Sequence, residues 1–329
     1  MTRIFVTRDI PDEGLDMLKK RASIRVDTYG KDKKIPRRDL LKGVQGADII
    51  LSILTDKIDS QVMDAAGPQL KMIANYAVGF DNIDLAAAKD RGIIVANAPG
   101  PEISESVAEH VVALMFGLAH RIVETDKFTR AGKYKGWGPK LLLGTDISGK
   151  TLGIIGTGSI GMALARRMSS GFGLKIIYND IKRNREIEKK YKAKYRSKTQ
   201  LLHEADFVSL HVPLLKSTKH LIGSKEIKLM KKTAFLINTS RGPIVDELAL
   251  VKALTKGEIA GAGIDVYECE PLIDCNPRDT YDLRKLDNVI LTPHTASATV
   301  ETRQALSRTV ARNILAYLDG KNISNKIDA

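Results

Sequence analysis

The chain has 329 residues, of which 43% are hydrophobic and 5% aromatic, and its formal net charge at pH 7 is +13. This length indicates about two domains, and the hydrophobic content excludes a globally disordered chain. The scarcity of aromatic residues argues against a surface built on base stacking, and the spread of Lys and Arg along the chain predicts no nucleic-acid partner. A basic surface instead favours the capture of small anionic substrates.

Cys269 and Cys275 are the only cysteines of the chain. They are too few for a disulfide framework, and no second pair or flanking histidine pair indicates a metal site, so we interpret Cys269 as a small packing residue. The N-terminus lacks the apolar core of a signal peptide, and the longest apolar run, residues 111–119, falls short of the roughly 20 residues that span a membrane. We therefore expect a cytoplasmic protein with no metal and no membrane partner.

The N-terminal part of the chain alternates between short β-rich segments and helical patterns. Strands are expected at 3–7, 23–29, 47–54, 70–78 and 92–97, and helices at 13–21 and 83–92. Such alternation predicts a parallel sheet with right-handed crossovers. Residues 97–104 interrupt the pattern with two prolines and a glycine, which indicates a hinge, and Ser104 or Ser106 can cap the long helix that follows.

A second alternating series begins with a strand and turn at 150–161. Further strands are expected at 174–180, 205–213, 234–240, 260–266 and 288–294, and their short apolar runs suit a sheet that is covered on both faces. Residues 299–320 have the pattern of an amphipathic helix, which we expect to return to the first domain. The fold class is therefore α/β, with two parallel-sheet domains of which the first is discontinuous in sequence.

Gly156, Gly158 and Gly161 form a Gly-x-Gly-x-x-Gly motif between an apolar strand and a helix. In that setting the motif is typical of dinucleotide binding. The three glycines permit a tight turn, the approach of a pyrophosphate to the backbone, and close packing of the helix on the strand.

Asp180 ends the strand that follows this motif. A carboxylate there can accept hydrogen bonds from a ribose 2′-OH and repels a 2′-phosphate. NAD is therefore favoured over NADP as the cofactor, although Lys182 and Arg183 lie close enough to weaken the preference.

Polar side chains follow three other strands of the second series: Arg241, the acids Asp265, Glu268 and Glu270, and His294. Because ligands bind at the carboxyl ends of parallel strands, we expect these residues to meet in one site. Such a set suits hydride transfer to the carbonyl of a 2-keto acid. The arginine binds the substrate carboxylate, the histidine donates a proton, and a neighbouring carboxylate raises the pKa of a histidine in this role. Strand alternation places Glu268 and Glu270 on one face and does not choose between them.

The other histidines carry weaker signals. His110, His120, His203 and His220 lie in helical or loop segments, and we interpret them as structural. His211 ends a strand, so it can line the cofactor cleft without taking part in the chemistry.

Six motifs resemble those of the D-isomer-specific 2-hydroxyacid dehydrogenases, and together they extend over nearly the whole chain. They are "NYAVGFDNID" (75–84), "SESVAEHVVALM" (104–115), "GTGSIG" (156–161), "INTSRGPIVDE" (237–247), "GIDVYECEP" (263–271) and "LTPHTASAT" (291–299). The resemblance is strongest to the glyoxylate/hydroxypyruvate reductase branch. It implies a Rossmann-like dinucleotide-binding domain at 100–293 inserted into a flavodoxin-like substrate domain at 1–99 and 294–329. It also implies an active site in the cleft and a homodimer.

The resemblance assigns residues to this site. Arg241, Glu270 and His294 would be catalytic, with His294 as proton donor, Glu270 supporting its protonated form and Arg241 binding the substrate. The cofactor would contact Val107, Gly156, Gly158, Ser159, Ile160, Gly161, Asp180, His211, Val212, Pro213, Thr239, Ser240, Arg241, Asp265, His294, Ala296 and Ser297, with Asp265 near the nicotinamide. The substrate would contact Leu54, Tyr76, Val78, Gly79, Arg241 and His294, and Trp137 would reach the site of the partner subunit.

Two details depart from the reductase branch. Ala296 stands where a glycine is usual, and the segment between Gly161 and Asp180 is one residue longer than expected. Neither departure removes a functional group.

The expected activity is the NAD-dependent reduction of a small 2-keto acid, with glyoxylate or hydroxypyruvate favoured, to the D-2-hydroxy acid. D-lactate dehydrogenase and short-form D-3-phosphoglycerate dehydrogenase are alternatives within the enzyme class, whereas formate dehydrogenase is disfavoured because a glutamine is expected where Glu270 stands. An NAD-sensing, corepressor-like interaction protein is the alternative from a different class.

Overall fold

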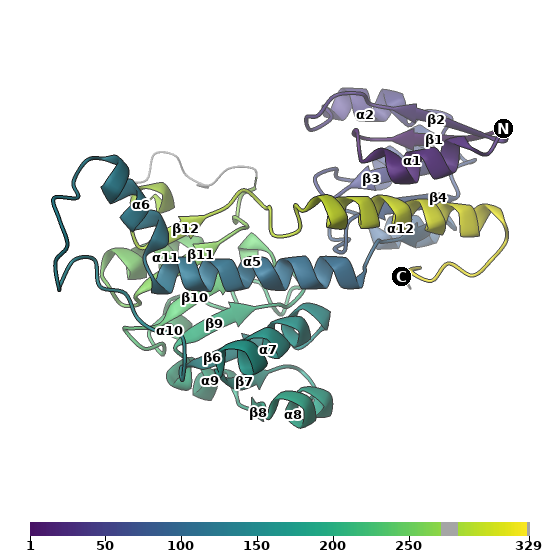
Figure 1. Cartoon of the computed structure of the whole chain (residues 1–329). Coiled ribbons are helices and arrows are strands. Elements are labelled where there is room, and N and C mark those ends of the chain that lie inside the picture. The colour runs from purple at the N-terminus through teal and green to yellow at the C-terminus, as the bar shows by residue number, and fades with distance from the viewer. Residues whose placement is uncertain (271–281, 328–329) are drawn as a thin grey trace. The chain divides into compact units, whose positions relative to one another are not determined.

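The computed structural model describes residues 1–270 and 282–327, and the chain divides into two compact units (Figure 1). Unit 1 comprises residues 1–103 and 298–329, and unit 2 comprises residues 104–297. Both boundaries lie four residues beyond those expected from the sequence. Each unit is organised around its own parallel β-sheet.

The sheet of unit 1 has five strands in the order β2-β1-β3-β4-β5, and every pairing in it is parallel. This is the flavodoxin-like order. The strands are β1 (Thr2–Val6), β2 (Ile24–Thr28), β3 (Ile49–Ile53), β4 (Met72–Tyr76) and β5 (Ile94–Ala96). All residues of β3 and β4 are buried, as expected for central strands that helices cover on both faces.

The helices of unit 1 are α1 (Asp12–Lys19), α2 (Arg37–Gly43), α3 (Ser60–Ala66), α4 (Leu85–Asp90) and α12 (Val300–Leu318). The C-terminal helix α12 lies beside α1 (Figure 1). The Gly14 backbone N–H donates to Ser307 Oγ at 3.0 Å, and a Cβ at Gly14 would lie 2.1 Å from the Ser307 carbonyl oxygen. Only a glycine permits this approach, so Gly14 is what allows the two helices to pack.

The sheet of unit 2 has seven parallel strands in the order β12-β11-β10-β9-β6-β7-β8. The strand order reverses direction between β6 and β9, which is the position where Rossmann-like sheets bind ligands. The strands are β6 (Thr151–Ile155), β7 (Lys175–Asn179), β8 (Lys194–Tyr195), β9 (Phe207–Leu210), β10 (Phe235–Asn238), β11 (Gly261–Ile264) and β12 (Val289–Leu291). The two-residue strand β8 is an edge strand that the sequence pattern did not predict.

The helices that belong wholly to unit 2 are α6 (Ile122–Arg130), α7 (Ser159–Phe172), α8 (Arg185–Tyr191), α9 (Lys198–Glu204), α10 (Ser224–Ile227) and α11 (Glu247–Thr255), with 3-10 turns at η1 (Gly242–Ile244) and η2 (Leu283–Lys285). The division between the units falls inside α5 (Pro101–Ala119). Our expectation that Ser104 or Ser106 caps this helix is wrong. The helix begins at Pro101, whose missing N–H suits the first helical position, and the Ser106 hydroxyl donates to the Ala296 carbonyl at 3.2 Å.

In the part of the chain that the structure describes, no single helix is both long and apolar enough to cross a membrane; only α5 and α6 taken together, bent by 59° at their junction, meet that criterion.

Candidate active site

The glycine motif forms the turn between β6 and α7. Gly156 has a φ of +94°, and a Cβ there would lie 2.5 Å from the His211 carbonyl oxygen, while a Cβ at Gly161 would lie 2.3 Å from the Gly156 carbonyl oxygen. A Cβ at Gly158 would meet no atom within 4 Å, so this glycine borders open space. Gly158 is also the N-cap of the 14-residue helix α7 and provides no side-chain cap. The first N–H groups of α7 can therefore bind an anion, and the turn fits a dinucleotide pyrophosphate.

Asp180 lies against this turn. Its Oδ2 accepts hydrogen bonds from the Thr157 backbone N–H and hydroxyl, both at 2.7 Å, and its Oδ1 accepts from the Ile181 N–H at 2.7 Å. Burial raises the pKa of the Asp180 carboxyl, but the hydrogen bonds from Thr157 and the backbone outweigh burial and leave the pKa below its ordinary value. Asp180 is therefore ionised at neutral pH. Thr157 was not predicted as a site residue, although a polar residue between two glycines was the available signal.

The residues that follow β9 face the glycine turn. The His211 N–H donates to the Ile155 carbonyl at 2.7 Å, and His211 Nε2 lies 2.9 Å from the Ser209 hydroxyl. Burial lowers the pKa of His211 to about 4. His211 is thus neutral at pH 7, which agrees with a lining role and gives it no part in proton transfer.

A buried hydroxyl without a partner follows β10. Among the described residues, no group accepts from or donates to Thr239 Oγ1, although this atom is buried. Buried polar atoms are nearly always hydrogen-bonded in folded proteins. An orphan hydroxyl at the carboxyl end of a central strand is what a site for a polar ligand would leave when the ligand is absent.

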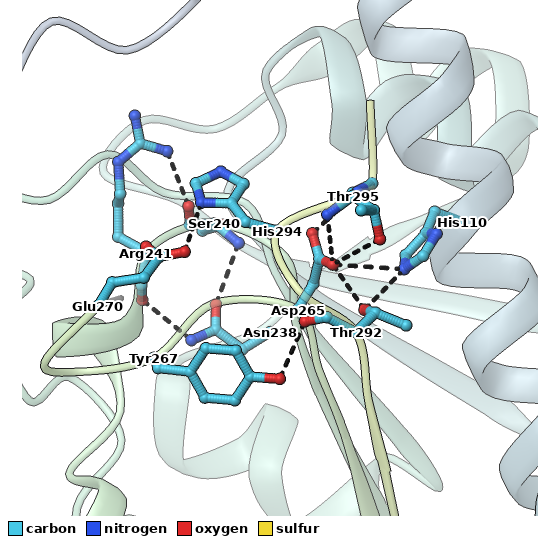
Figure 2. A network of polar contacts seen from close by, with 11 residues as sticks. His110, Asn238, Ser240, Arg241, Asp265, Tyr267, Glu270, Thr292, His294 and Thr295 are labelled. Carbon is cyan, nitrogen blue, oxygen red and sulfur yellow. Dashed lines mark hydrogen bonds and ion pairs between the residues drawn. The ribbon is translucent and has the colours of Figure 1, made fainter. Parts of the chain in front are cut away.

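A buried asparagine shapes the turn that carries Arg241. Asn238 Nδ2 donates to the Arg241 carbonyl at 2.9 Å, and Asn238 Oδ1 accepts from the Ser240 N–H at 3.1 Å (Figure 2). Arg241 Nη1 donates in turn to the Ser240 carbonyl at 2.9 Å. Asn238 is only 1% exposed, so it acts as a fixed support for the turn. Asn238 was not predicted as a site residue, although a polar residue at the end of an apolar strand was the available signal.

Asp265 anchors the loop that follows β12. Its carboxylate is fully buried and accepts hydrogen bonds from the Thr292 hydroxyl at 2.5 Å, the Thr295 N–H at 2.8 Å and the Ala296 N–H at 2.9 Å. His110 joins the network, because its Nε2 lies 3.0 Å from the Thr292 hydroxyl and 3.7 Å from Asp265 Oδ1 (Figure 2). His110 therefore supports the site, beyond the simple structural role we expected.

This network sets the position of His294. The His294 N–H donates to the Asp265 carbonyl at 2.8 Å, and the residue has a φ of 56°, in the left-handed region that non-glycine residues seldom occupy. Strained backbone of this kind persists where the surroundings enforce it, as they often do at functional sites. His294 Nδ1 lies 2.8 Å from Glu270 Oε1. Among the described residues Nε2 has no hydrogen-bond partner, so that nitrogen is available to a ligand.

The structure thus brings Arg241, Glu270 and His294 together. They follow β10, β11 and β12, and Figure 2 shows their side chains gathered at one edge of the sheet. In neutral histidine one ring nitrogen donates a hydrogen bond and the other accepts one. A carboxylate that accepts from Nδ1–H therefore fixes the orientation of the ring.

Glu268 is not a second partner of His294, although strand alternation left it equivalent to Glu270. Its Oε1 lies 2.6 Å from His220 Nε2, and its Oε2 accepts from the Glu247 N–H at 3.3 Å. Cys269 is also not the simple packing residue we expected, because it is disulfide-bonded. The only other cysteine, Cys275, lies outside the described residues.

The residues expected to bind substrate in unit 1 lie at or just after the ends of β3 and β4. Asn97 Nδ2 donates to the Val78 carbonyl at 2.7 Å, and Asn75 Nδ2 donates to the Gly79 carbonyl at 2.9 Å. The N–H groups of Val78 and Gly79 have no acceptor among the described residues. Two fixed carbonyls with adjacent free N–H groups form an arrangement that can bind a carboxylate.

The hydroxyl of Tyr76 serves the fold of unit 1. It donates to the Arg303 carbonyl at 2.7 Å, and burial raises the pKa of Tyr76 to about 12. Leu54 comes directly after β3 and is partly exposed. Trp137 is 84% exposed.

The remaining expected cofactor residues lie in unit 2. Ser159 and Ile160 open α7, Val107 is buried in α5, Val212 and Pro213 follow His211, and Ser297 follows Ala296 at the end of the unit. No cluster of three or more His, Cys, Asp or Glu side chains that could hold a metal ion occurs in residues 1–270 and 282–327.

Comparisons with known proteins identify the family of this chain. Residues 112–296 match the family described as the D-isomer specific 2-hydroxyacid dehydrogenase, NAD binding domain. Glyoxylate reductase from Thermococcus litoralis is 47% identical, over 98% of this chain and 97% of that protein.

Solved structures extend the similarity to the whole fold. The TT0316 protein from Thermus thermophilus has a TM-score of 0.91 at 39% identity and covers 99% of this chain and 100% of its own. An NADPH-dependent glyoxylate/hydroxypyruvate reductase from Sinorhizobium meliloti has a TM-score of 0.84 at 29% identity, with 99% and 98% coverage. The chain is an α/β protein with a Rossmann-like dinucleotide-binding domain, and it belongs to the D-isomer-specific 2-hydroxyacid dehydrogenase family.

Proposed function

We propose that this protein reduces a small 2-keto acid, with glyoxylate or hydroxypyruvate favoured, to the D-2-hydroxy acid, using NADH. The observation that carries the proposal is the contact of His294 Nδ1 with Glu270 at 2.8 Å beside Arg241, at the edge of the sheet that also bears the glycine turn. The high identity to a glyoxylate reductase supports the choice of substrate.

The residues of the glycine turn would hold the pyrophosphate, with Asp180 at the adenosine ribose. The nicotinamide supplies the hydride when the cofactor is bound. His294 Nε2 faces the substrate and gives its proton to the carbonyl oxygen, while Glu270 on Nδ1 stabilises the positively charged ring before that transfer. Arg241 can bind the substrate carboxylate through two parallel hydrogen bonds.

The N–H groups of Val78 and Gly79 in unit 1 are proposed to bind a substrate carboxylate. Backbone N–H groups bind the carboxylate without any protein side chain. The contact therefore does not depend on the rest of the substrate. A substrate as small as glyoxylate has little else to recognise, and its carboxylate is the natural point of attachment.

We also propose a homodimer. Large apolar side chains that are exposed in the described chain concentrate between residues 122 and 143: Ile122, Val123, Tyr134, Trp137, Leu141 and Leu143. Helix α6 in this segment has no buried residue. An apolar surface of this kind is typical of a protein interface, and contact with the partner subunit would cover Trp137.

A turnover assay tests the activity directly. NADH and NADPH are each combined with glyoxylate, hydroxypyruvate, pyruvate and phosphohydroxypyruvate. We expect the highest kcat/KM with NADH and either glyoxylate or hydroxypyruvate. If the protein binds NADH but reduces none of these keto acids, the proposed enzymatic activity is wrong. The alternative, an NAD-sensing interaction protein, would then be favoured.

A further inference from the structure

Arg183 lies in the loop that follows Asp180, and this loop is tied to the glycine turn. Asn184, the next residue, donates from Nδ2 to the Thr157 carbonyl at 3.1 Å and caps helix α8 through its Oδ1. Thr157 is also the residue that holds Asp180. The loop is therefore fixed close to the carboxylate that is proposed to read the ribose.

The guanidinium of Arg183 is engaged by Glu188. Arg183 Nε donates to Glu188 Oε1 at 2.6 Å, and Arg185 Nη1 approaches Glu188 Oε2 at 3.4 Å. Glu188 is itself held by a buried group, because the hydroxyl of Tyr178 donates to its Oε1 at 2.7 Å and Tyr178 is fully buried. The side chain of Glu188 is 17% exposed, whereas that of Arg183 is 56% exposed. Glu188 is thus the more buried partner of this pair and Arg183 the more exposed one.

An arginine three residues after the ribose acid has the chemistry to bind a 2′-phosphate. In this chain a carboxylate neutralises that arginine and directs its Nε elsewhere. Asp180 keeps its own negative charge beside the turn, and this charge disfavours a further negative charge on the cofactor.

We propose that Glu188 is a specificity-determining residue, which disfavours 2′-phosphorylated dinucleotides by holding Arg183 in an ion pair. Arg183 would then be able to bind a 2′-phosphate once the charge of Glu188 is removed. This inference rests on the proposed binding of the dinucleotide at the glycine turn, and it extends the role of Asp180 to a neighbouring pair.

Glu188→Gln tests this inference, because glutamine removes the charge but still accepts a hydrogen bond from Tyr178. Glu186→Gln is the matched control. It makes the same change of charge on the same helix, but Glu186 pairs with Lys190 at 2.6 Å. The measurement is the binding of adenosine 2′,5′-bisphosphate and 5′-AMP to the full-length variants by isothermal titration calorimetry, repeated with NADPH and NADH.

We expect Glu188→Gln to tighten adenosine 2′,5′-bisphosphate and NADPH by roughly threefold to tenfold, with 5′-AMP and NADH changed less than about twofold. Adding Arg183→Ala to Glu188→Gln should remove the gain. An equal gain in Glu186→Gln, or a gain that persists without Arg183, would overturn the inference. An unchanged preference in a variant that binds NADH and reduces keto acids would overturn the inference alone, whereas failure of the unaltered protein to bind any of these ligands would overturn the dinucleotide site itself.

Discussion

Two histidine–glutamate pairs occur in unit 2, and their glutamates, Glu268 and Glu270, lie on the same short segment. His294 uses Nδ1 toward Glu270 at 2.8 Å, and His220 uses Nε2 toward Glu268 at 2.6 Å. Both histidines have left-handed backbone, with φ of 56° and 50°. Distance and backbone conformation therefore do not distinguish a catalytic pair from a structural one.

The surroundings of the two pairs differ. Glu268 also accepts from the Glu247 N–H at 3.3 Å, and its own N–H donates to Glu247 Oε2 at 3.0 Å, so this pair fastens its segment to the start of α11. His294 lies beside Arg241, on a loop that the buried carboxylate of Asp265 organises. The neighbours of a histidine–carboxylate contact, and not the contact itself, therefore indicate whether the pair is catalytic.

Replacing each histidine by glutamine should separate the two pairs most strongly. His294→Gln is expected to lower kcat for keto-acid reduction by roughly 10³-fold, because it removes the proton donor. NADH binding should be retained. His220→Gln, the matched control, should keep kcat within about threefold. Steady-state kinetics with NADH and glyoxylate provide the measurement, and comparable losses in both variants would remove the distinction.

A third histidine, His211, differs from both pairs. It has a hydroxyl partner and no carboxylate partner in the described structure. Its pKa in the folded protein is about 4, against an ordinary value of 6.5. The unfolded chain therefore binds this proton first as the pH falls from 6.5 towards 4, and the folded state loses stability in that window.

His211→Gln should reduce that loss. Between pH 7 and pH 4.5, the free energy of unfolding of the unaltered protein should fall by about 2 kcal/mol more than that of the variant. Urea denaturation at the two pH values measures the difference. Parallel losses in the two proteins would show that His211 does not carry this pH dependence.

Replacing each of the two glutamates should change the stability of the protein by a different amount. Glu268→Gln is expected to lower the free energy of unfolding by about 1 kcal/mol, since the charged acceptor of the Glu247 N–H and of His220 becomes neutral. Glu270→Gln should have a smaller effect, because Glu270 is more exposed. Thermal and urea denaturation at pH 7 compare the two, and a larger loss for Glu270→Gln would contradict this account.

Much of the fold was predictable because its signals are local. The strands of both sheets lie within or next to the apolar runs that predicted them, apart from β8, whose two residues Lys194 and Tyr195 carry no apolar pattern. The start of α5 was misplaced because Ser104 and Ser106 have the chemistry of N-caps. Pro101 was an equally valid local signal, and the pattern alone does not rank the two.

The site was predictable only in part, because many of its contacts join distant residues. His110 and Thr292 are 182 residues apart, and His220 and Glu268 are 48 apart. No periodicity contains such pairs, so the sequence did not predict the partners of His110 and Glu268. Asn238 makes contacts within three residues, whereas Thr157 contacts Asp180, which lies 23 residues away. The role of each depends on which oxygen or nitrogen faces the turn, and spacing does not specify that.

The most direct test of the account compares the pH–rate profiles of Glu270→Gln and Glu268→Gln. The reduction needs a protonated proton donor, so kcat/KM with NADH and glyoxylate falls as the pH rises. Removing the charge of Glu270 should move this fall to lower pH, while Glu268→Gln should leave it where the unaltered protein has it. A shift caused by Glu268→Gln with none from Glu270→Gln would contradict the assignment of the catalytic pair.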